Sequence, residues 1–258
     1  MGAPCVLEDM ETTIVPGLTL DVEVAAAGLG GEAILLTTLW AAVGLGTTGW
    51  LVGAGFAAGL AVLLNRAVLR KTARSLGPAD RVTLARAVLV GGVTALVADH
   101  AGPAALVPLA AVALVLDAVD GLVARRTRTT SAMGARFDME IDALLILVLS
   151  VQVGRSLGGW VLAIGLMRYV FLVAGRFAPW LRADLPPSLA RKTVAALQGV
   201  VLTVLAAGIL PYDAAVTVAG LALATLCWSF GRDARYLYGL RAPRAWPASA
   251  AAGVRAPR

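Results

Sequence analysis

The sequence predicts an all-α integral membrane protein, and three observations support this prediction. Of the 258 residues, 59% are hydrophobic and only 15% are charged, with a mean hydropathy of +0.82. A soluble domain of this length needs a larger charged surface. Apolar runs of about 20 residues recur along the chain, which is enough for a helix to cross the hydrocarbon layer. These runs do not alternate over about 10 residues, as the strands of a membrane β-barrel do.

Three parts of the chain precede the predicted core. Residues 1–32 are mixed and acidic, which predicts an N-terminal extension. Residues 33–65 are an apolar block that predicts one or two extra membrane segments, because closely spaced glycines from Gly44 to Gly49 mark either a bend or a tight hairpin. Residues 66–80 mix apolar and basic side chains at helical spacing, which predicts an amphipathic helix in the membrane interface. A solvated linker is the alternative for this last part.

Residues 81–236 are predicted to form a core bundle of six membrane-spanning helices. The spans are expected near residues 82–99, 103–124, 135–154, 158–178, 191–210 and 213–231. The final part, residues 237–258, is predicted to be a disordered basic tail.

Positive charge gathers at one end of these six spans. Arginine and lysine precede the first span, lie between the second and third and between the fourth and fifth, and follow the sixth. The opposite connections carry almost none, so the positive-inside rule places the arginine-rich end in the cytoplasm. The net charge of +6 is then explained by anionic lipid head groups and membrane orientation, and no nucleic-acid partner is expected.

Four aspartates interrupt the apolar pattern at the predicted cytoplasmic end. Asp117 and Asp120 lie three residues apart at the end of one span, so they share a helix face. Asp138 and Asp142 lie four residues apart near the start of the next span and also share a face. A short connection makes the two helices antiparallel neighbours, so the four carboxylates are expected to converge. Their charge requires protonation, arginines or bound cations.

The ligand types favour a hard divalent metal and a phosphate-bearing substrate. The chain has one histidine and two widely separated cysteines, so oxygen ligands favour Mg²⁺ or Mn²⁺. Gly121 and Ala124 leave room beside the helix, and Arg125 offers a planar donor fork suited to phosphate. Gly134 allows close approach near the start of the next helix, where backbone N–H groups favour an anion. A diphosphate bridged to the carboxylates by metal fits all of these features.

These eight positions resemble the signature of the CDP-alcohol phosphotransferase family, also called CDP-alcohol phosphatidyltransferases. Between Asp117 and Asp142 the chain reads D-x-x-D-G-x-x-A-R, then eight residues, then G-x-x-x-D-x-x-x-D. The resemblance covers roughly residues 78–232. It implies a homodimeric membrane enzyme that transfers a substituted phosphate group from a CDP-linked lipid, such as CDP-diacylglycerol, to a small polar alcohol and releases CMP.

The resemblance also implies roles for individual residues. Asp117, Asp120 and Asp138 would hold two Mg²⁺ or Mn²⁺ ions. Asp142 would be the general base and also a metal ligand. The CDP part of the donor is expected to contact Asp117, Gly121, Ala124, Arg125, Ser131, Gly134, Asp80 and Thr83. The stretch "PADRVTLAR" is similar to the family's Asn-x-x-Thr-x-x-Arg element through Thr83 and Arg86, with Asp80 where asparagine is usual. A direct in-line displacement is the simplest mechanism.

Three basic residues, Arg168, Arg176 and Lys192, are the candidates for binding the acceptor. Arg168 lies inside an apolar span, where an unpaired charge is costly, and Arg176 lies eight residues on, roughly on the same face. The pair is similar to an Arg-Glu…Arg element of family members that use glycerol 3-phosphate, with Tyr169 in place of the glutamate. Lys192 and Gln198 resemble a pairing in the same branch, so a phosphorylated acceptor, first of all glycerol 3-phosphate, is favoured. The alternative is that Arg168 pairs with a signature aspartate and that the other two residues only set the topology.

Other functions use similar residues. An intramembrane prenyltransferase binds diphosphate through metal-bound aspartates, but these usually lie on different loops and lack the Gly–Ala–Arg pattern. A divalent-cation transporter places acidic residues near the midplane or on both sides, whereas these gather on one side. A purely structural role, with helix-end aspartates paired to arginines across the loop, does not account for Ala124 and Arg125 in register with both glycines.

Overall fold

The computed structural model describes residues 16–69, 78–127, 132–183 and 188–240. They form eight α-helices and two short 3-10 helices, without a strand among these residues. The elements are α1 (Pro16–Val43), α2 (Thr47–Leu69), α3 (Pro78–Ala98), α4 (Pro103–Thr127), α5 (Ala132–Leu157), η1 (Gly159–Val161), α6 (Leu162–Phe177), η2 (Pro179–Arg182), α7 (Leu189–Ala206) and α8 (Tyr212–Leu240). The all-α fold class predicted from the sequence is confirmed.

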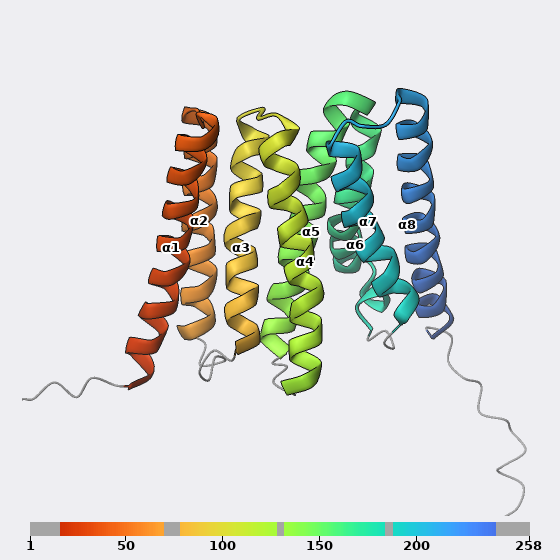
Figure 1. The fold of residues 1–258 in the computed structure, drawn as a ribbon. Helices are drawn as coiled ribbons and strands as arrows, with labels where there is room; N and C mark the ends of the chain where they lie inside the picture. The colour runs from red at the N-terminus through yellow and green to blue at the C-terminus, as the bar shows by residue number, and fades with distance from the viewer. Residues whose placement is uncertain (1–15, 70–77, 128–131, 184–187, 241–258) are drawn as a thin grey trace, which may run out of the picture.

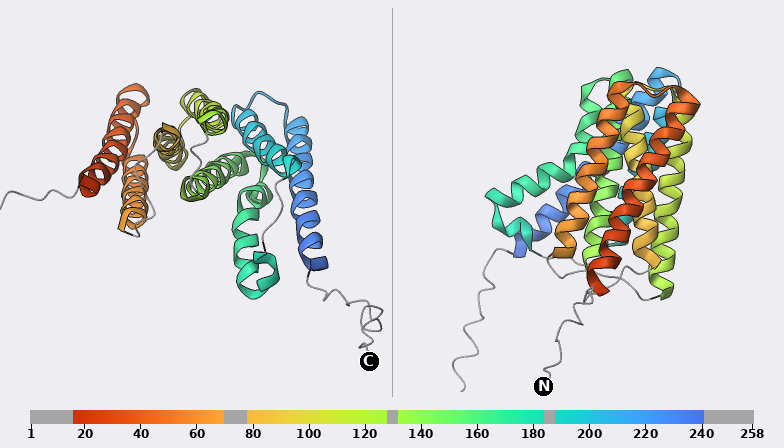
Figure 2. Two further views of the ribbon diagram at one scale, coloured as in Figure 1. Left: turned by 90° about the horizontal axis from the view of Figure 1, so that it is seen from below. Right: turned by 90° about the vertical axis from the view of Figure 1, so that its left-hand side faces the viewer.

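The helices stand side by side and run alternately up and down (Figure 1). Seen from below, α1 and α2 lie at one end of the array, α3, α4 and α5 in the middle, and α6, α7 and α8 at the other end (Figure 2). Helix α4 ends and α5 begins at the lower end in Figure 1. Residues on both sides of the connection between these two helices therefore meet at that end.

Four helices are long and apolar enough to cross a membrane, judged by length and composition over the described residues. The apolar stretches are Ala26–Val43 in α1, Gly159–Phe177 in η1 and α6, Leu189–Ala206 in α7, and Tyr212–Leu240 in α8. Shorter apolar stretches lie in α2, α3 and α4, at Thr47–Leu63, Val82–Ala98 and Pro103–Val119. Helices α3 to α8 overlap the residues of the six spans predicted for the core, and the core of six membrane spans stays a prediction.

The N-terminal apolar block forms a hairpin of two helices. Helix α1 begins at Pro16, inside the part predicted as an extension. Gly44 has φ 72°, a left-handed conformation that favours glycine, so the closely spaced glycines make a tight turn and not a bend. Of the amphipathic helix predicted over 66–80, the first residues end α2 and the last begin α3, while residues 70–77 lie outside the described part. The predicted tail begins inside α8, and residues 241–258 are also outside it.

Helix α3 is the central helix, and it packs against α1, α2, α4 and α5. Its fully buried residues include Val90, Val93 and Leu96. At Gly91 the carboxylate of Glu32 from α1 lies so close that an added methyl group would clash with it. At the upper end of the hairpin, the backbone N–H of Gly46 donates a 2.7 Å hydrogen bond to Oδ2 of Asp99. Helix α3 therefore joins the α1–α2 hairpin to the rest of the molecule.

Candidate active site

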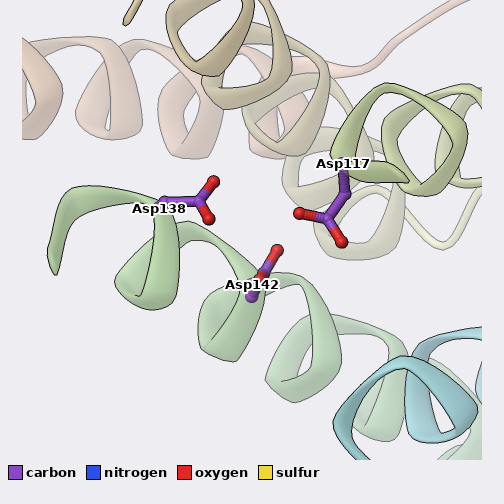
Figure 3. Close-up of side chains that lie close together, drawn as sticks. All are labelled: Asp117, Asp138 and Asp142. Atoms are coloured by element: carbon purple, nitrogen blue, oxygen red, sulfur yellow. The ribbon is translucent and has the colours of Figure 1, made fainter. Parts of the chain in front are cut away.

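Three of the four signature aspartates come together at the lower end of the bundle. Asp117 projects from α4, and Asp138 and Asp142 project from the first part of α5 toward it (Figure 3). One carboxylate oxygen from each residue lies within 4.8 Å of the others. Asp138 and Asp142 share a face because four residues are close to one helical turn. The carboxylates of these three residues therefore lie close together, as their spacing in the sequence predicted.

The other signature residues lie on the same two helices or between them. Asp120, Gly121, Ala124 and Arg125 fall near the end of α4, and Gly134 falls in the first turn of α5. The side chains of these residues, and that of Asp80 in the first turn of α3, are not among the described ones. Ser131 lies in the connection outside the described residues, and Thr83 is buried in α3.

Arg86 of α3 forms the inner wall of the acidic cluster. Its Nη1 donates a 2.6 Å hydrogen bond to Oδ1 of Asp117. Its Nη2 donates to Oδ1 of Asp138 at 2.5 Å and lies 3.0 Å from Oδ1 of Asp142. A planar guanidinium can serve several carboxylates at once, whereas the ammonium of lysine acts as a point charge. Arg86 therefore ties α3, α4 and α5 together at the site.

The electrostatics of the cluster suit a divalent cation. The Arg86 side chain is 1% exposed, whereas those of Asp117, Asp138 and Asp142 are 36%, 33% and 39% exposed. Arg86 binds the Oδ1 atom of each carboxylate, and no hydrogen bond from the described residues reaches the three Oδ2 atoms. Three ionised carboxylates against one guanidinium leave two negative charges in excess. Hard oxygen donors with excess negative charge fit Mg²⁺ or Mn²⁺.

The candidate acceptor residues are spread along α6 and the start of α7. Arg168 in α6 pairs through Nη2 with Oε1 of Glu140 in α5, at 2.5 Å. Arg168 thereby lies beside the part of α5 that carries Asp142. Its direct ion-pair partner is thus Glu140 and not a signature aspartate. Arg176 and Lys192 are exposed and form no ion pair within the described part of the chain.

Two residues of the site do not emerge from the sequence as site residues. Arg86 stands out there only as the last residue of the Thr-x-x-Arg element. Arg86 lies one turn after Thr83, at the start of the first core span. This position could have predicted its contact with the aspartates. Glu140 lies between Asp138 and Asp142 in the chain, and no pattern in the sequence identifies its partner on another helix.

Comparison with known proteins agrees with this geometry. No curated protein and no solved structure matches the chain significantly. The family model for CDP-alcohol phosphatidyltransferase matches residues 76–228, which is more than half of the chain and includes Arg86 and the signature aspartates. The enzymes of this family are transferases that use a divalent metal, and the apolar helices described above are those of a membrane protein. The chain therefore belongs to the CDP-alcohol phosphatidyltransferase family.

Proposed function

We propose that this enzyme transfers the phosphatidyl group of a CDP-linked lipid, such as CDP-diacylglycerol, to the hydroxyl of a small phosphorylated alcohol. Glycerol 3-phosphate is the acceptor that we favour, and CMP is the second product. The observation that carries the proposal is the convergence of Asp117, Asp138 and Asp142 around Arg86, inside the region that the family model matches. Family membership supports the reaction class, and the surroundings of Arg168 support the class of acceptor.

The signature aspartates are proposed to hold two divalent ions, Mg²⁺ or Mn²⁺. Asp117, Asp120 and Asp138 would be the ligands, with Asp142 as a further one. When bound, the ions offset negative charge on the donor diphosphate and on the departing CMP. Arg86 engages Oδ1 of each described carboxylate, which leaves the Oδ2 atoms to serve as metal ligands. The arginine thereby holds the ligand atoms in place before any substrate arrives.

Asp142 is proposed as the general base of a direct displacement. The hydroxyl oxygen of the acceptor attacks the phosphorus that carries the lipid, and a new P–O bond forms. The P–O bond to CMP breaks, and CMP leaves with the electron pair. The proton of the hydroxyl passes to the Asp142 carboxylate, which increases the nucleophilicity of the oxygen during the attack. No covalent enzyme intermediate is required.

Arg168 is proposed to bind the phosphate of the acceptor. Arg168 pairs with Glu140, two residues from Asp142 on α5, so one small molecule could place a hydroxyl at the base and a phosphate at the arginine. The Nε atom of Arg168 is buried and has no hydrogen-bond partner among the described residues. Nη1 forms no hydrogen bond or ion pair with the described residues, so it is the donor that a phosphate oxygen would bind. Arg176 and Lys192 would attract the anion from the surrounding water.

The remaining assignments concern the nucleotide, the orientation and the oligomer. The CDP group is proposed to lie beside the end of α4, in contact with Asp117, Gly121, Ala124, Arg125, Ser131, Gly134, Asp80 and Thr83. The site faces the cytoplasm, because the arginine-rich connections lie at the same end. A homodimer is proposed from the family resemblance.

The experiment that tests this proposal is a CMP-release assay on purified protein in liposomes with CDP-diacylglycerol and Mg²⁺ or Mn²⁺. Glycerol 3-phosphate, inositol phosphate, inositol, serine and choline are supplied one at a time. CMP release that one phosphorylated acceptor stimulates and that EDTA abolishes is the expected result. CMP release with neutral acceptors only would refute the proposal that the acceptor is phosphorylated. No release with any of the five alcohols would refute the proposed reaction.

A further inference from the structure

Glu140 belongs to the helix of the catalytic aspartates but faces a different neighbour. It lies two residues from both Asp138 and Asp142, and two residues correspond to a rotation of roughly 200° about the helix axis. Its carboxylate therefore turns away from the acidic cluster and toward α6, where Oε1 meets Nη2 of Arg168 at 2.5 Å. The side chains of Glu140 and Arg168 are 50% and 30% exposed, so the rest of the protein does not enclose this pair.

The pair uses only part of the guanidinium. Nη2 of Arg168 is bound to Glu140, and Nε is buried without a hydrogen-bond partner among the described residues. No other hydrogen bond or ion pair of Arg168 occurs in that part of the chain. An arginine has five N–H donors in a planar fork that suits bidentate binding of phosphate. Glu140 thus holds Arg168 through Nη2, and Nη1 is the donor left for an anion.

We propose that Glu140 is a specificity-determining residue, because its carboxylate shares Arg168 with the phosphate of the acceptor and so limits the preference for phosphorylated over neutral alcohols. This inference rests on the proposed function, in which Arg168 binds the acceptor. Without an acceptor, Glu140 offsets the charge of Arg168. When a phosphate binds the same guanidinium, the carboxylate repels it, whereas a neutral alcohol experiences no such repulsion.

The test compares wild-type enzyme with Glu140→Gln, which keeps the shape and an oxygen acceptor for Arg168 but removes the charge. For an exposed ion pair, we expect KM for glycerol 3-phosphate to fall roughly two- to fivefold. KM for glycerol and for CDP-diacylglycerol, and kcat, should not change. Glu140→Asp keeps the charge and should have a KM ratio close to wild type. The decrease should become smaller as salt is added, because ions screen exposed charges.

Asp213→Asn is the matched control, since Asp213 is an exposed carboxylate in the first turn of α8, at the other end of the bundle. It should leave every KM unchanged. If Glu140→Gln leaves KM for glycerol 3-phosphate unchanged, or changes KM equally for glycerol, Glu140 only braces α5 against α6 and the inference is wrong. Inositol phosphate and inositol form a second pair of acceptors for the same comparison.

Calorimetry separates the failure of this inference from failure of the proposed function. Glycerol 3-phosphate is titrated into wild-type protein and into Glu140→Gln, both saturated with CMP and Mg²⁺. A wild-type protein that binds CMP but never releases it from CDP-diacylglycerol refutes the reaction. Tighter binding of glycerol 3-phosphate by Glu140→Gln supports the role of Glu140 whatever the turnover. Equal binding by the two proteins, or binding by neither, overturns that role.

Discussion

Arg86 carries one positive charge and faces three carboxylates from two helices. Removal of one partner from a buried ion pair costs about 3–5 kcal/mol, so we expect Arg86→Leu to lower thermal stability strongly. Arg86→Lys keeps the charge but loses the fork, so it should be more stable than Arg86→Leu and still lose most activity. Melting in detergent and CMP release measure the two effects. Wild-type turnover by Arg86→Lys would show that the planar guanidinium is not needed for activity.

Asp142→Asn should separate binding from chemistry. The amide cannot accept the proton of the acceptor hydroxyl, so we expect turnover to fall by about 10²- to 10⁴-fold. Binding of CDP-diacylglycerol should persist, because the other signature aspartates are intact. Turnover is followed by CMP release, and binding by calorimetry with Mg²⁺. Wild-type turnover in this variant would refute the assignment of the base.

Asp138→Asn should affect an earlier step than Asp142→Asn. Asp138 is a proposed metal ligand, and its Oδ1 accepts a hydrogen bond from Arg86. We expect the neutral amide to weaken Mg²⁺- or Mn²⁺-dependent binding of CMP as well as turnover. Calorimetric titration of CMP with and without EDTA measures this. An unchanged metal requirement and affinity would exclude Asp138 as a ligand.

At the level of residues, helical spacing predicted some of these relations and not others. Asp138 and Asp142 lie one turn apart on one helix, so local geometry alone brings their carboxylates together. Arg86 contacts residues 31 and 52 positions away in the chain, and Arg168 meets Glu140 across 28 positions. Such pairs depend on how each helix is rotated against its neighbour. A single sequence does not contain that rotation.

The contact between α1 and α3 depends on the absence of a side chain at Gly91. A methyl group there would clash with the carboxylate of Glu32, which is fully buried. We expect Gly91→Ala to destabilise the protein by about 1–3 kcal/mol, because α1 must shift or Glu32 must change its conformation. Thermal unfolding in detergent measures the loss.

A double-mutant cycle tests whether Glu32 is the cause. Glu32→Ala removes the group that clashes, so Gly91→Ala should cost less in that background than in the wild type. Gly59→Ala is the matched control, since Gly59 lies in α2 with nothing within 4 Å of an added Cβ. It should be neutral or slightly stabilising. Equal costs of Gly91→Ala in both backgrounds would refute the contact.

The helices themselves were largely predictable, and their ends were not. The apolar runs predicted α3 to α8, because a membrane span must be both long and apolar. Helix α8 continues to Leu240, beyond the span predicted over 213–231, because a helix can extend past a membrane span with charged residues such as Arg232 and Asp233. Hydropathy also left the choice between a bend and a hairpin at Gly44 open, since it carries no information on φ.

The orientation of the whole molecule can be tested with single cysteines. After replacement of Cys5 and Cys227 by serine, Gly102→Cys places a thiol in the exposed connection between α3 and α4, at the upper end in Figure 1. Ala183→Cys places one just after η2, at the end that carries the aspartates. With the arginine-rich end in the cytoplasm, a membrane-impermeant maleimide should label Gly102→Cys in intact cells and Ala183→Cys only after permeabilisation. The reverse pattern would invert the topology.

The enclosed position of α3 determines from which direction a lipid can reach the aspartates. Helices α1, α2, α4 and α5 pack against α3, and the Arg86 side chain is 1% exposed, so the α1–α2 hairpin and α3 close one side of the aspartate cluster. We therefore expect the proposed donor lipid to reach the aspartates from the side opposite the α1–α2 hairpin. The α1–α2 hairpin thereby limits the directions from which a lipid can approach the aspartates within the plane of the membrane.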